Sequence, residues 1–327
     1  MRAASILVAI GALFLAAPAM AEDPLVLETK IPLPDVDGRI DHMAIDLAHQ
    51  RLFVAELGND SVGVIDLAHR KVIRTLYHLK EPQGVAYQAD TETLYVASGL
   101  DGAVRLFVGT ALKPGDVIPL GRDADNIRID AKTGLVLVGH STGAIAMIDP
   151  VSHTKERDIP LREHPEGFAL APAGDRIFVN VPDMRQIVVL DRSAGKQVAA
   201  WSTADGHENF PMALDEASGR ILTVYRRPPR LDALSSADGK VVASIPTCGD
   251  ADDVFVDQRR NRIYVSCGEG VVDVFERQGD GYGRLARVLT SSGARTSLFS
   301  DALDRLYVAA RSVGGAPAAI WVLRPTP

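Results

Sequence analysis

The sequence has only two cysteines and two tryptophans, and no apolar run after residue 21 approaches the length of a membrane helix. Two cysteines are too few for a structural zinc site, which usually takes about four nitrogen or sulfur ligands. There is no Cys-x-x-Cys-His motif for covalent heme, and no Walker or dinucleotide-binding glycine fingerprint in a strand-to-helix setting. We therefore expect no membrane span, no nucleotide cofactor and no covalent heme.

Linkers and charge blocks are missing as well. No Gly/Ser-rich stretch or low-complexity tract interrupts the chain, which favours one domain. We also expect a monomer. The formal net charge is −7, and this disfavours binding to phosphate backbones or anionic lipids. The sequence therefore disfavours nucleic acid as a partner.

The first 21 residues have the layout of a cleaved secretory signal. Arg2 precedes an apolar stretch from Ile6 to Ala17, and Ala19-Met20-Ala21 stands before Glu22. We expect cleavage near Ala21, so that residues 1–21 are a signal peptide and residues 22–327 the mature domain. Export would place the protein in the periplasm or outside the cell.

An oxidising compartment makes a disulfide between Cys248 and Cys267 plausible. Both cysteines lie in one repeat, beyond the same ends of two adjacent antiparallel strands. The alternative is a pair of half-buried thiols. The two possibilities stay open at this point.

One short pattern of β-forming residues occurs seven times. The middle residues of successive runs are 41 to 44 residues apart, which is the length of a four-stranded propeller blade. The spacing predicts an all-β, single seven-bladed β-propeller. The runs are Leu52-Phe53-Val54, Leu94-Tyr95-Val96, Val136-Leu137-Val138, Ile177-Phe178-Val179, Ile221-Leu222-Thr223, Ile263-Tyr264-Val265 and Leu306-Tyr307-Val308.

The ends of the chain predict how the ring closes. The first copy has strands at 43–46, 52–55, 62–65 and 71–76, whereas the seventh has only three, at 297–299, 306–309 and 320–323. The segment 25–33 resembles a fourth strand that stands alone before the first copy. Pairing it with the last three strands gives a three-plus-one closure and removes the exposed edges of an open array.

Aspartates recur in the turn after the first strand of a repeat, where a short carboxylate can accept hydrogen bonds from the turn backbone. We interpret these five residues as turn caps: Asp46, Asp130, Asp215, Asp257 and Asp301.

The strand patterns at 52–66 and 177–191 resemble those of the YVTN-repeat propellers, and the exported single-domain layout is similar to the YncE-type proteins. The resemblance covers nearly all of the mature chain. It implies a propeller fold, within a group that includes binding proteins and relatives of lactonases and of heme- or quinone-linked enzymes. The fifth repeat departs from the pattern with Tyr225-Arg226-Arg227-Pro228-Pro229-Arg230.

Polar side chains gather where the chain leads into the first strand of each repeat. These segments share one face of the ring with the loops that join second and third strands, so their side chains converge on the axis from different blades. We predict a polar funnel on this face. The residues expected to bind a ligand there are His42, Gln83, Asn126, Glu166, Asn209, Asp252, Asp253 and Arg295; Asp41 and Asp125 adjoin them, and His164 lies just upstream of Glu166.

Several chemistries could use such a funnel. Oxygen ligands from Asn126, Glu166, Asn209 and Asp253 would suit Ca²⁺ or another divalent ion that polarises a carbonyl. His42 or His164 could act as a general base beside a carboxylate such as Glu166. Alternatively, His42, His140 and His164 could hold copper or zinc.

Three functions remain open on this basis. The leading hypothesis is an exported propeller that binds a small polar molecule or a periplasmic partner protein through the funnel. The first alternative is a lactonase-type or metal-assisted hydrolase with the catalytic candidates His42, His164 and Glu166. The second is an accessory subunit of a periplasmic redox system.

Overall fold

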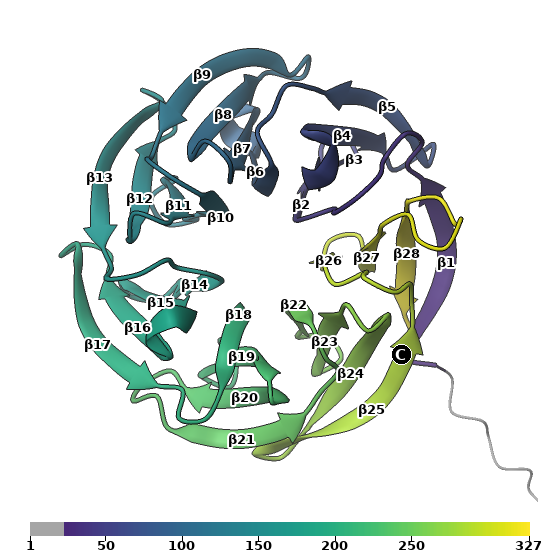
Figure 1. Ribbon diagram of the computed structural model, residues 1–327. Helices are drawn as coiled ribbons and strands as arrows, with labels where there is room; N and C mark the ends of the chain where they lie inside the picture. Colours follow the sequence, from purple (N-terminus) through teal and green to yellow (C-terminus); the bar gives the residue numbers. More distant parts are fainter. Residues whose placement is uncertain (1–22) are drawn as a thin grey trace, which may run out of the picture.

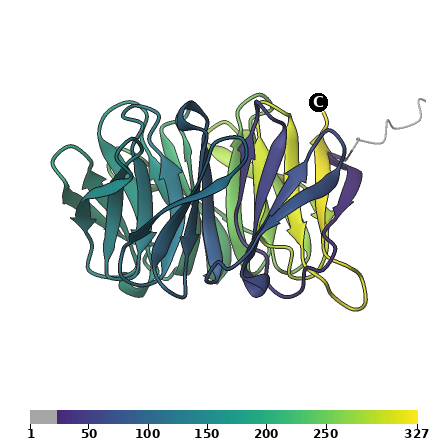
Figure 2. The same cartoon turned by 90° about the horizontal axis from the view of Figure 1, so that it is seen from above.

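Seven four-stranded antiparallel sheets form a closed ring around a central axis (Figure 1). This computed structural model describes residues 23–327; the predicted signal peptide, residues 1–21, lies outside them. Seen from the side, the blades stand next to one another as a disc (Figure 2). The prediction of an all-β seven-bladed propeller with four-stranded blades is confirmed.

The blades follow one another along the chain, and each begins with its innermost strand. Blade 1 consists of β2 (Met43–Asp46), β3 (Arg51–Glu56), β4 (Ser61–Asp66) and β5 (Lys71–Leu76). Blade 2 consists of β6 (Pro82–Gln88), β7 (Thr93–Ser98), β8 (Ala103–Val108) and β9 (Lys113–Pro119). Blade 3 consists of β10 (Ala124–Ile129), β11 (Val136–His140), β12 (Ala144–Asp149) and β13 (Thr154–Pro160).

Blades 4 to 6 continue the order. They are β14 (Phe168–Leu170), β15 (Arg176–Val181), β16 (Gln186–Asp191), β17 (Lys196–Ser202); β18 (His207–Asp215), β19 (Arg220–Arg227), β20 (Pro229–Ser235), β21 (Val241–Pro246); and β22 (Ala251–Asp257), β23 (Arg262–Cys267), β24 (Val271–Gln278), β25 (Gly281–Leu289). Blade 7 is β26 (Ser297–Ser300), β27 (Arg305–Ala310), β28 (Ala319–Pro325) and β1 (Leu25–Pro32).

Short 3₁₀ turns are the only helical elements of residues 23–327: Leu57–Asn59, Ala89–Thr91 and Pro182–Met184. None of the helices in that part of the chain is long or apolar enough to cross a bilayer.

The repeated apolar runs lie in the second strand of each blade, where both faces are covered by neighbouring blades. All six residues of β3 and of β7 are buried, whereas β5 at the outer edge is mostly exposed. Phe53 and Val62 of blade 1 pack with Leu94 and Phe107 of blade 2 in one cluster. Burial on both faces requires an unbroken apolar strand at a fixed place in every blade, and this explains the regular spacing in the sequence.

The ring is closed by the N-terminal strand. β1 pairs antiparallel with β28, with Leu27 opposite Leu323 and Ile31 opposite Ile320. The sheet order is β1-β28-β27-β26, so the predicted three-plus-one closure is confirmed. Ile31 is 1% exposed and packs with Val54 of blade 1, which extends the core across the closure.

The turns after the innermost strands lie on the face opposite the funnel. Four of the five aspartates accept hydrogen bonds from backbone N–H groups of their own turn, as predicted: Asp46, Asp130, Asp215 and Asp257. Asp301 differs, because its side chain is 61% exposed and the hydroxyl of Ser300 accepts the turn N–H of Leu303 instead. Ser300 ends β26 and pairs with Arg305, as Asp46 ends β2 and pairs with Arg51, so Ser300 occupies the capping position in blade 7.

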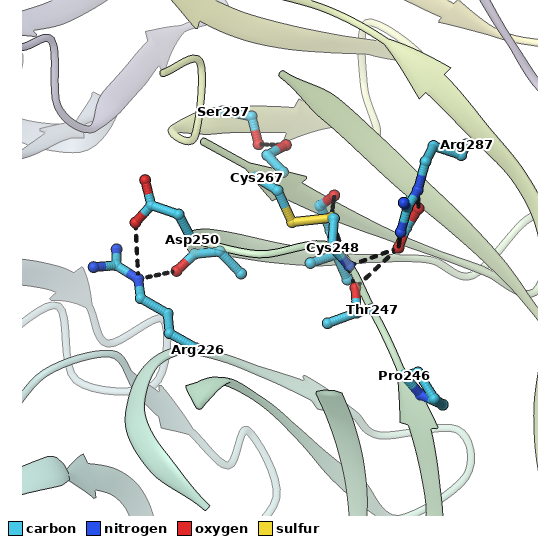
Figure 3. Close-up of a disulfide and its surroundings, with 12 residues drawn as sticks. Arg226, Pro246, Thr247, Cys248, Asp250, Cys267, Arg287 and Ser297 are labelled. Carbon is cyan, nitrogen blue, oxygen red and sulfur yellow. Dashed lines mark hydrogen bonds and ion pairs between the residues drawn. A yellow bond between two sulfur atoms is a disulfide. The ribbon is translucent and has the colours of Figure 1, made fainter. Parts of the chain in front are cut away.

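Cys248 and Cys267 form a disulfide (Figure 3). Cys248 lies in the loop before β22 and Cys267 ends β23, so the bond ties the loop to the middle of blade 6. The N–H of Cys248 also donates to the buried carboxylate of Asp273 at 2.8 Å, and Arg287 donates to the same carboxylate at 2.7 Å. These contacts fix the chain just before the acidic residues of blade 6.

Candidate functional site

A channel of about 1050 Å³ runs along the axis of the ring and is lined by the innermost strands of all seven blades. Its two ends differ in chemistry. The segments that lead into these strands place ionisable side chains at one end, which we call the mouth. The mouth is formed by Asp41, His42, Asp125, Glu166, Asp252 and Asp253.

Irregular pairing brings consecutive residues to the mouth together. Register shifts at the start of the innermost strands lie between Ala124 and Ile127 in blade 3 and between Ala251 and Asp253 in blade 6. In blade 1, Asp41 N–H donates to the carbonyl of Ala55, and Ala55 N–H donates to the carbonyl of His42. Asp41 and His42 thus both lie opposite Ala55, as in a β-bulge. The usual alternation of side chains, which would direct one of the two away from the channel, is interrupted there.

Close contact between blades also positions the mouth. Gly84 of blade 2 lies against the main-chain oxygen of Asp125, and a Cβ at this position would collide with that oxygen. The glycine lets the mouth segments of two blades approach each other directly. The Asp125 carboxylate is therefore held by main-chain packing rather than by a flexible loop.

His42 is bound on two sides by carboxylates. Its Nδ1 lies 3.6 Å from Asp253 Oδ1 and its Nε2 lies 3.7 Å from Asp41 Oδ1. Burial alone would lower the pKa of His42, but Asp253 and Asp41 outweigh it and raise the pKa to about 10. His42 is therefore cationic at neutral pH, which makes it a poor general base. Asp41 has a second cationic partner in Arg39, at 2.8 Å.

Asp252 is paired with two arginines from neighbouring blades. Arg226 donates to Asp252 Oδ1 at 2.6 Å, and Arg295 Nε lies 2.9 Å from Asp252 Oδ2. Both arginines also reach Asp250, and Figure 3 shows Arg226 beside Asp250 next to the disulfide. This network joins blades 5, 6 and 7 and neutralises the acidic segment of blade 6.

Asp125 and Glu166 have no such cationic partner. Asp125 is 9% exposed and accepts one hydrogen bond, from Asn126 at 3.3 Å; no Lys or Arg of residues 23–327 forms an ion pair with either carboxyl group. Burial, together with Asp41 and Asp123, raises the pKa of Asp125 to about 7 despite the cation at His42. Burial, then Asp125 and Asp252, also raises the pKa of Glu166 well above its ordinary value.

His164 completes a cluster with these two carboxyl groups. Its Nε2 lies 3.8 Å from Glu166 Oε1, and one potential ligand atom each of Asp125, His164 and Glu166 lie within 4.8 Å of one another. Burial lowers the pKa of His164, so the imidazole is neutral at neutral pH. A neutral imidazole beside carboxylates can ligate a divalent ion or accept a proton.

The deeper part of the channel is largely apolar, apart from one arginine. The innermost strands run from the mouth towards the opposite face, so their later residues lie deeper. Arg128 follows Asn126 by two residues in β10 and projects from the same face of the strand. The apolar wall is formed by Ile45, Tyr87, Ile129, Leu170, Leu214, Phe255, Val256 and Phe299.

A smaller cavity of about 640 Å³ adjoins the mouth between blades 4 and 5. Glu166 and Phe210 line both cavities, and His164 faces the smaller one. Its wall carries both basic and acidic side chains, with Arg185, His207 and Arg227 beside Asp183 and Glu208. Glu166 therefore lies where the two cavities meet.

The structure brings only part of the predicted ligand set together. His42, Asn126, Glu166, Asp252 and Asp253 line the channel, whereas Gln83 and Arg295 stand at the rim, bonded to Asp123 and to the acidic segment of blade 6. Asn209 corrects the prediction, because it is fully buried between blades 4 and 5 and donates to Asn180 at 2.9 Å. The register shift between Asn209 and Met212 turns it away from the axis.

The predicted metal ligands also need correction. Without Asn209, the set of Asn126, Glu166, Asn209 and Asp253 does not converge, and Asp253 is engaged with His42 and with the N–H of Ser297 at 2.7 Å. The three-histidine alternative fails as well, since His140 is 1% exposed and bonded to Thr142 and Asp158. The cluster that does converge is Asp125, His164 and Glu166.

Arg39 and Arg128 were missed by the sequence analysis. Arg128 could have been found, because strand alternation places it on the same face as Asn126. Arg39 carries no such signal, since it lies in an irregular segment ahead of β2.

No known protein family matches this chain by sequence, and no curated protein does. Among solved structures, the chain is similar to a chain of hydrazine synthase from Kuenenia stuttgartiensis, with a TM-score of 0.74, 18% identity, and coverage of 88% of this chain and 96% of that chain. It is also similar to a chain of a mitotic checkpoint complex, with a TM-score of 0.79, 13% identity and full coverage of both chains.

Identities this low show the fold alone. The ring of blades and these likenesses define the chain as a seven-bladed β-propeller, a fold that commonly mediates ligand or protein binding. The YVTN-repeat and YncE-type relationship stays a prediction.

Proposed function

We propose that this protein is an exported binding protein whose channel mouth takes up a small polar ligand bearing a cationic group. The observation that carries the proposal is the pair Asp125 and Glu166: Asp125 is 9% exposed, the Glu166 side chain is 21% exposed, and within residues 23–327 neither carboxyl group has a Lys or Arg partner. Buried like charges are costly unless a cation or hydrogen-bond donor offsets them. A ligand can supply that cation.

The neighbouring groups support this choice by contrast. Asp41, Asp252 and Asp253 already have partners in Arg39, Arg226 and His42. The carboxyl groups without a Lys or Arg partner, those of Asp125 and Glu166, thus lie on one side of the mouth. They line a cavity of a size typical for small-molecule sites.

The cellular setting is part of the proposal. We infer that residues 1–21 direct export and that the mature propeller, residues 22–327, acts as a monomer in the periplasm or outside the cell. Binding of a periplasmic protein, or an accessory role in a redox system, would use the rim of the same face.

A metal-assisted hydrolase is the second candidate function, and the cluster of Asp125, His164 and Glu166 favours it. A divalent ion held there would polarise a carbonyl. In a mechanism without an ion, neutral His164 would be a better general base than cationic His42. Metal analysis of protein purified without chelator, followed by a lactone hydrolysis assay, tests this candidate.

The binding function is tested by calorimetric titration of chelator-treated mature protein with small organic ammonium ions, including phenethylamine. We expect Glu166→Gln to weaken binding by about tenfold or more, as expected for loss of a charge-assisted hydrogen bond. Glu216→Gln is the matched control, because Glu216 lines the opposite end of the channel and is exposed. Equal binding by wild type and Glu166→Gln would contradict the proposal.

A further inference from the structure

The guanidinium of Arg128 lies in the channel without a carboxylate partner. Its Nη1 donates to the carbonyl of Ile127 at 2.8 Å, and its Nη2 lies 3.4 Å from Asn126 Oδ1. The group stands over the ring of Phe168, 5.4 Å from its centroid. Within residues 23–327, no carboxylate oxygen comes within ion-pair distance of it.

Three other arginines at the mouth are paired with acids. Arg39 contacts Asp41, and Arg226 and Arg295 contact Asp252. A guanidinium has five N–H donors and stays charged in proteins, so two neutral acceptors leave most of its capacity unused. Burial lowers the pKa of Arg128, although the more distant carboxyl groups of Asp253 and Asp125 act in the opposite direction.

Arg128 lies close to the unpaired acids of the mouth. Asn126 accepts from Arg128 at 3.4 Å and donates to Asp125 Oδ2 at 3.3 Å, so one carboxamide bridges the guanidinium and the carboxylate. A molecule whose ammonium and carboxylate are separated by one carbon is about as long as this carboxamide. Its positive end complements the Asp125 carboxylate and its negative end complements the Arg128 guanidinium. It can contact Asp125 and Arg128 at once.

The walls beyond Arg128 define the rest of the molecule. Ile129, Leu170, Leu214 and Phe255 come from four blades and line the channel. An apolar substituent placed there gains roughly 25 cal/mol for each Å² removed from water. A purely anionic ligand is disfavoured, because the mouth carries more carboxylates than cations.

We propose that the ligand is a small zwitterion with an apolar substituent, similar to an apolar α-amino acid. This inference rests on the proposed cationic site and adds the anion seat at Arg128. The ammonium lies at Asp125 and Glu166, the carboxylate at Arg128, and the substituent against the apolar wall. Arg128 thereby determines which ammonium compounds are selected.

The test uses matched probes on chelator-treated mature protein. One series is L-phenylalanine, phenethylamine and 3-phenylpropanoate; the other is L-leucine, 3-methylbutylamine and 4-methylpentanoate. In wild type we expect at least one of the two amino acids to bind about tenfold more tightly than its amine, and both carboxylates to bind most weakly.

Arg128→Gln removes the charge and keeps hydrogen-bonding capacity. We expect it to bring the affinity for the amino acid down to that of the amine, while the amine binds as before or more tightly. Arg176→Gln is the matched control, because Arg176 also donates to main-chain oxygens, at Ser236, but lies outside the channel lining. Unchanged melting temperatures show that the variants fold.

The outcomes separate the two proposals. Amines that bind as tightly as their amino acids, or a ratio that Arg128→Gln leaves unchanged, overturn the zwitterion and leave the cationic site standing. Carboxylates that bind while amines do not overturn the cationic site and the zwitterion together. No binding by any of the six probes also overturns the zwitterion.

Discussion

His42 Nδ1 lies 3.6 Å from Asp253 Oδ1, although the two residues come from blades 1 and 6 and blade 7 stands between these blades. The pair therefore lies near the axis of the ring and connects two blades that are not neighbours. Asp41 and Asp125 add to the negative field at the same imidazole. The contact links ring geometry to the protonation of one side chain.

We predict that this contact makes stability depend on pH. The pKa of His42 is about 10 in the folded protein, above the ordinary histidine value of about 6.5. The contribution is complete below about pH 6.5 and decreases as the pH rises towards 10, because the unfolded chain releases the proton first. Urea unfolding of wild type and His42→Asn should differ most at pH 6 and least at pH 10.

His69→Gln is the control for this series, since His69 is exposed and pairs only with Asp66. Its difference from wild type should be small at every pH. A stability gap for His42→Asn that stays constant or widens towards pH 10 would show that His42 is not held as a cation.

The disulfide should stabilise the ring and hold the acidic segment of blade 6 in place. Its cysteines are 19 residues apart in the chain, so its loss should cost about 3 kcal/mol by the chain-entropy estimate. We expect Cys248→Ser with Cys267→Ser to unfold at lower urea concentration. Two free thiols in the non-reduced, denatured protein would contradict the bond itself.

Removal of the closing strand should open the ring. A mature chain without residues 23–33 exposes the edge of β28 and the apolar face of blade 1 that Ile31 and Leu33 cover, so we expect aggregation measurable by light scattering. Within the strand, Ile31→Ala should cost about 2–5 kcal/mol because Ile31 is buried. Leu27→Ala, at a position 43% exposed, should change stability by about 0.5 kcal/mol or less. A truncated protein that stays monomeric with unchanged melting would refute the closure.

Asp257 does more than cap a turn. It is fully buried, accepts from the hydroxyl of Tyr264 at 2.7 Å and pairs with Arg260 at 3.0 Å. Asp257→Ala should cost about 1–3 kcal/mol, since it leaves the buried hydroxyl of Tyr264 without its acceptor, whereas Arg260 keeps its second partner Asp304. Asp149→Ala is the milder control, because Asp149 accepts backbone N–H groups of an exposed turn. Equal unfolding midpoints for the two variants would show that Asp257 acts only as a cap.

The blade count could be read from the sequence because every blade needs one strand buried on both faces. Phe53, Tyr95 and Tyr264 stand in such strands and are fully buried, so their spacing reports the spacing of the blades. Closure could also be predicted, because a lone strand at one end of the chain matched a missing strand at the other.

The mouth could be predicted only in part. The segments before the innermost strands pointed to Glu166 and Asp253, but the register shifts that turn Asp125 inward and Asn209 outward leave no mark in the residue pattern. The sequence offered Arg226 and Arg295 as cationic partners for the acidic residues of the rim, but not which acid each would bind. Only the folded ring shows that Asp252 is neutralised by Arg226 and Arg295 while Asp125 is not.

Pairing of β1 with β28 also sets an order of events during biosynthesis. The first strand leaves the ribosome before any other, yet its partner is made last, after nearly 300 further residues. Until then β1 has no partner strand and the sheet of blade 7 is incomplete, and a prematurely terminated chain stays in this state. Only a chain translated through β28 can therefore pair β1, complete the sheet of blade 7 and close the ring.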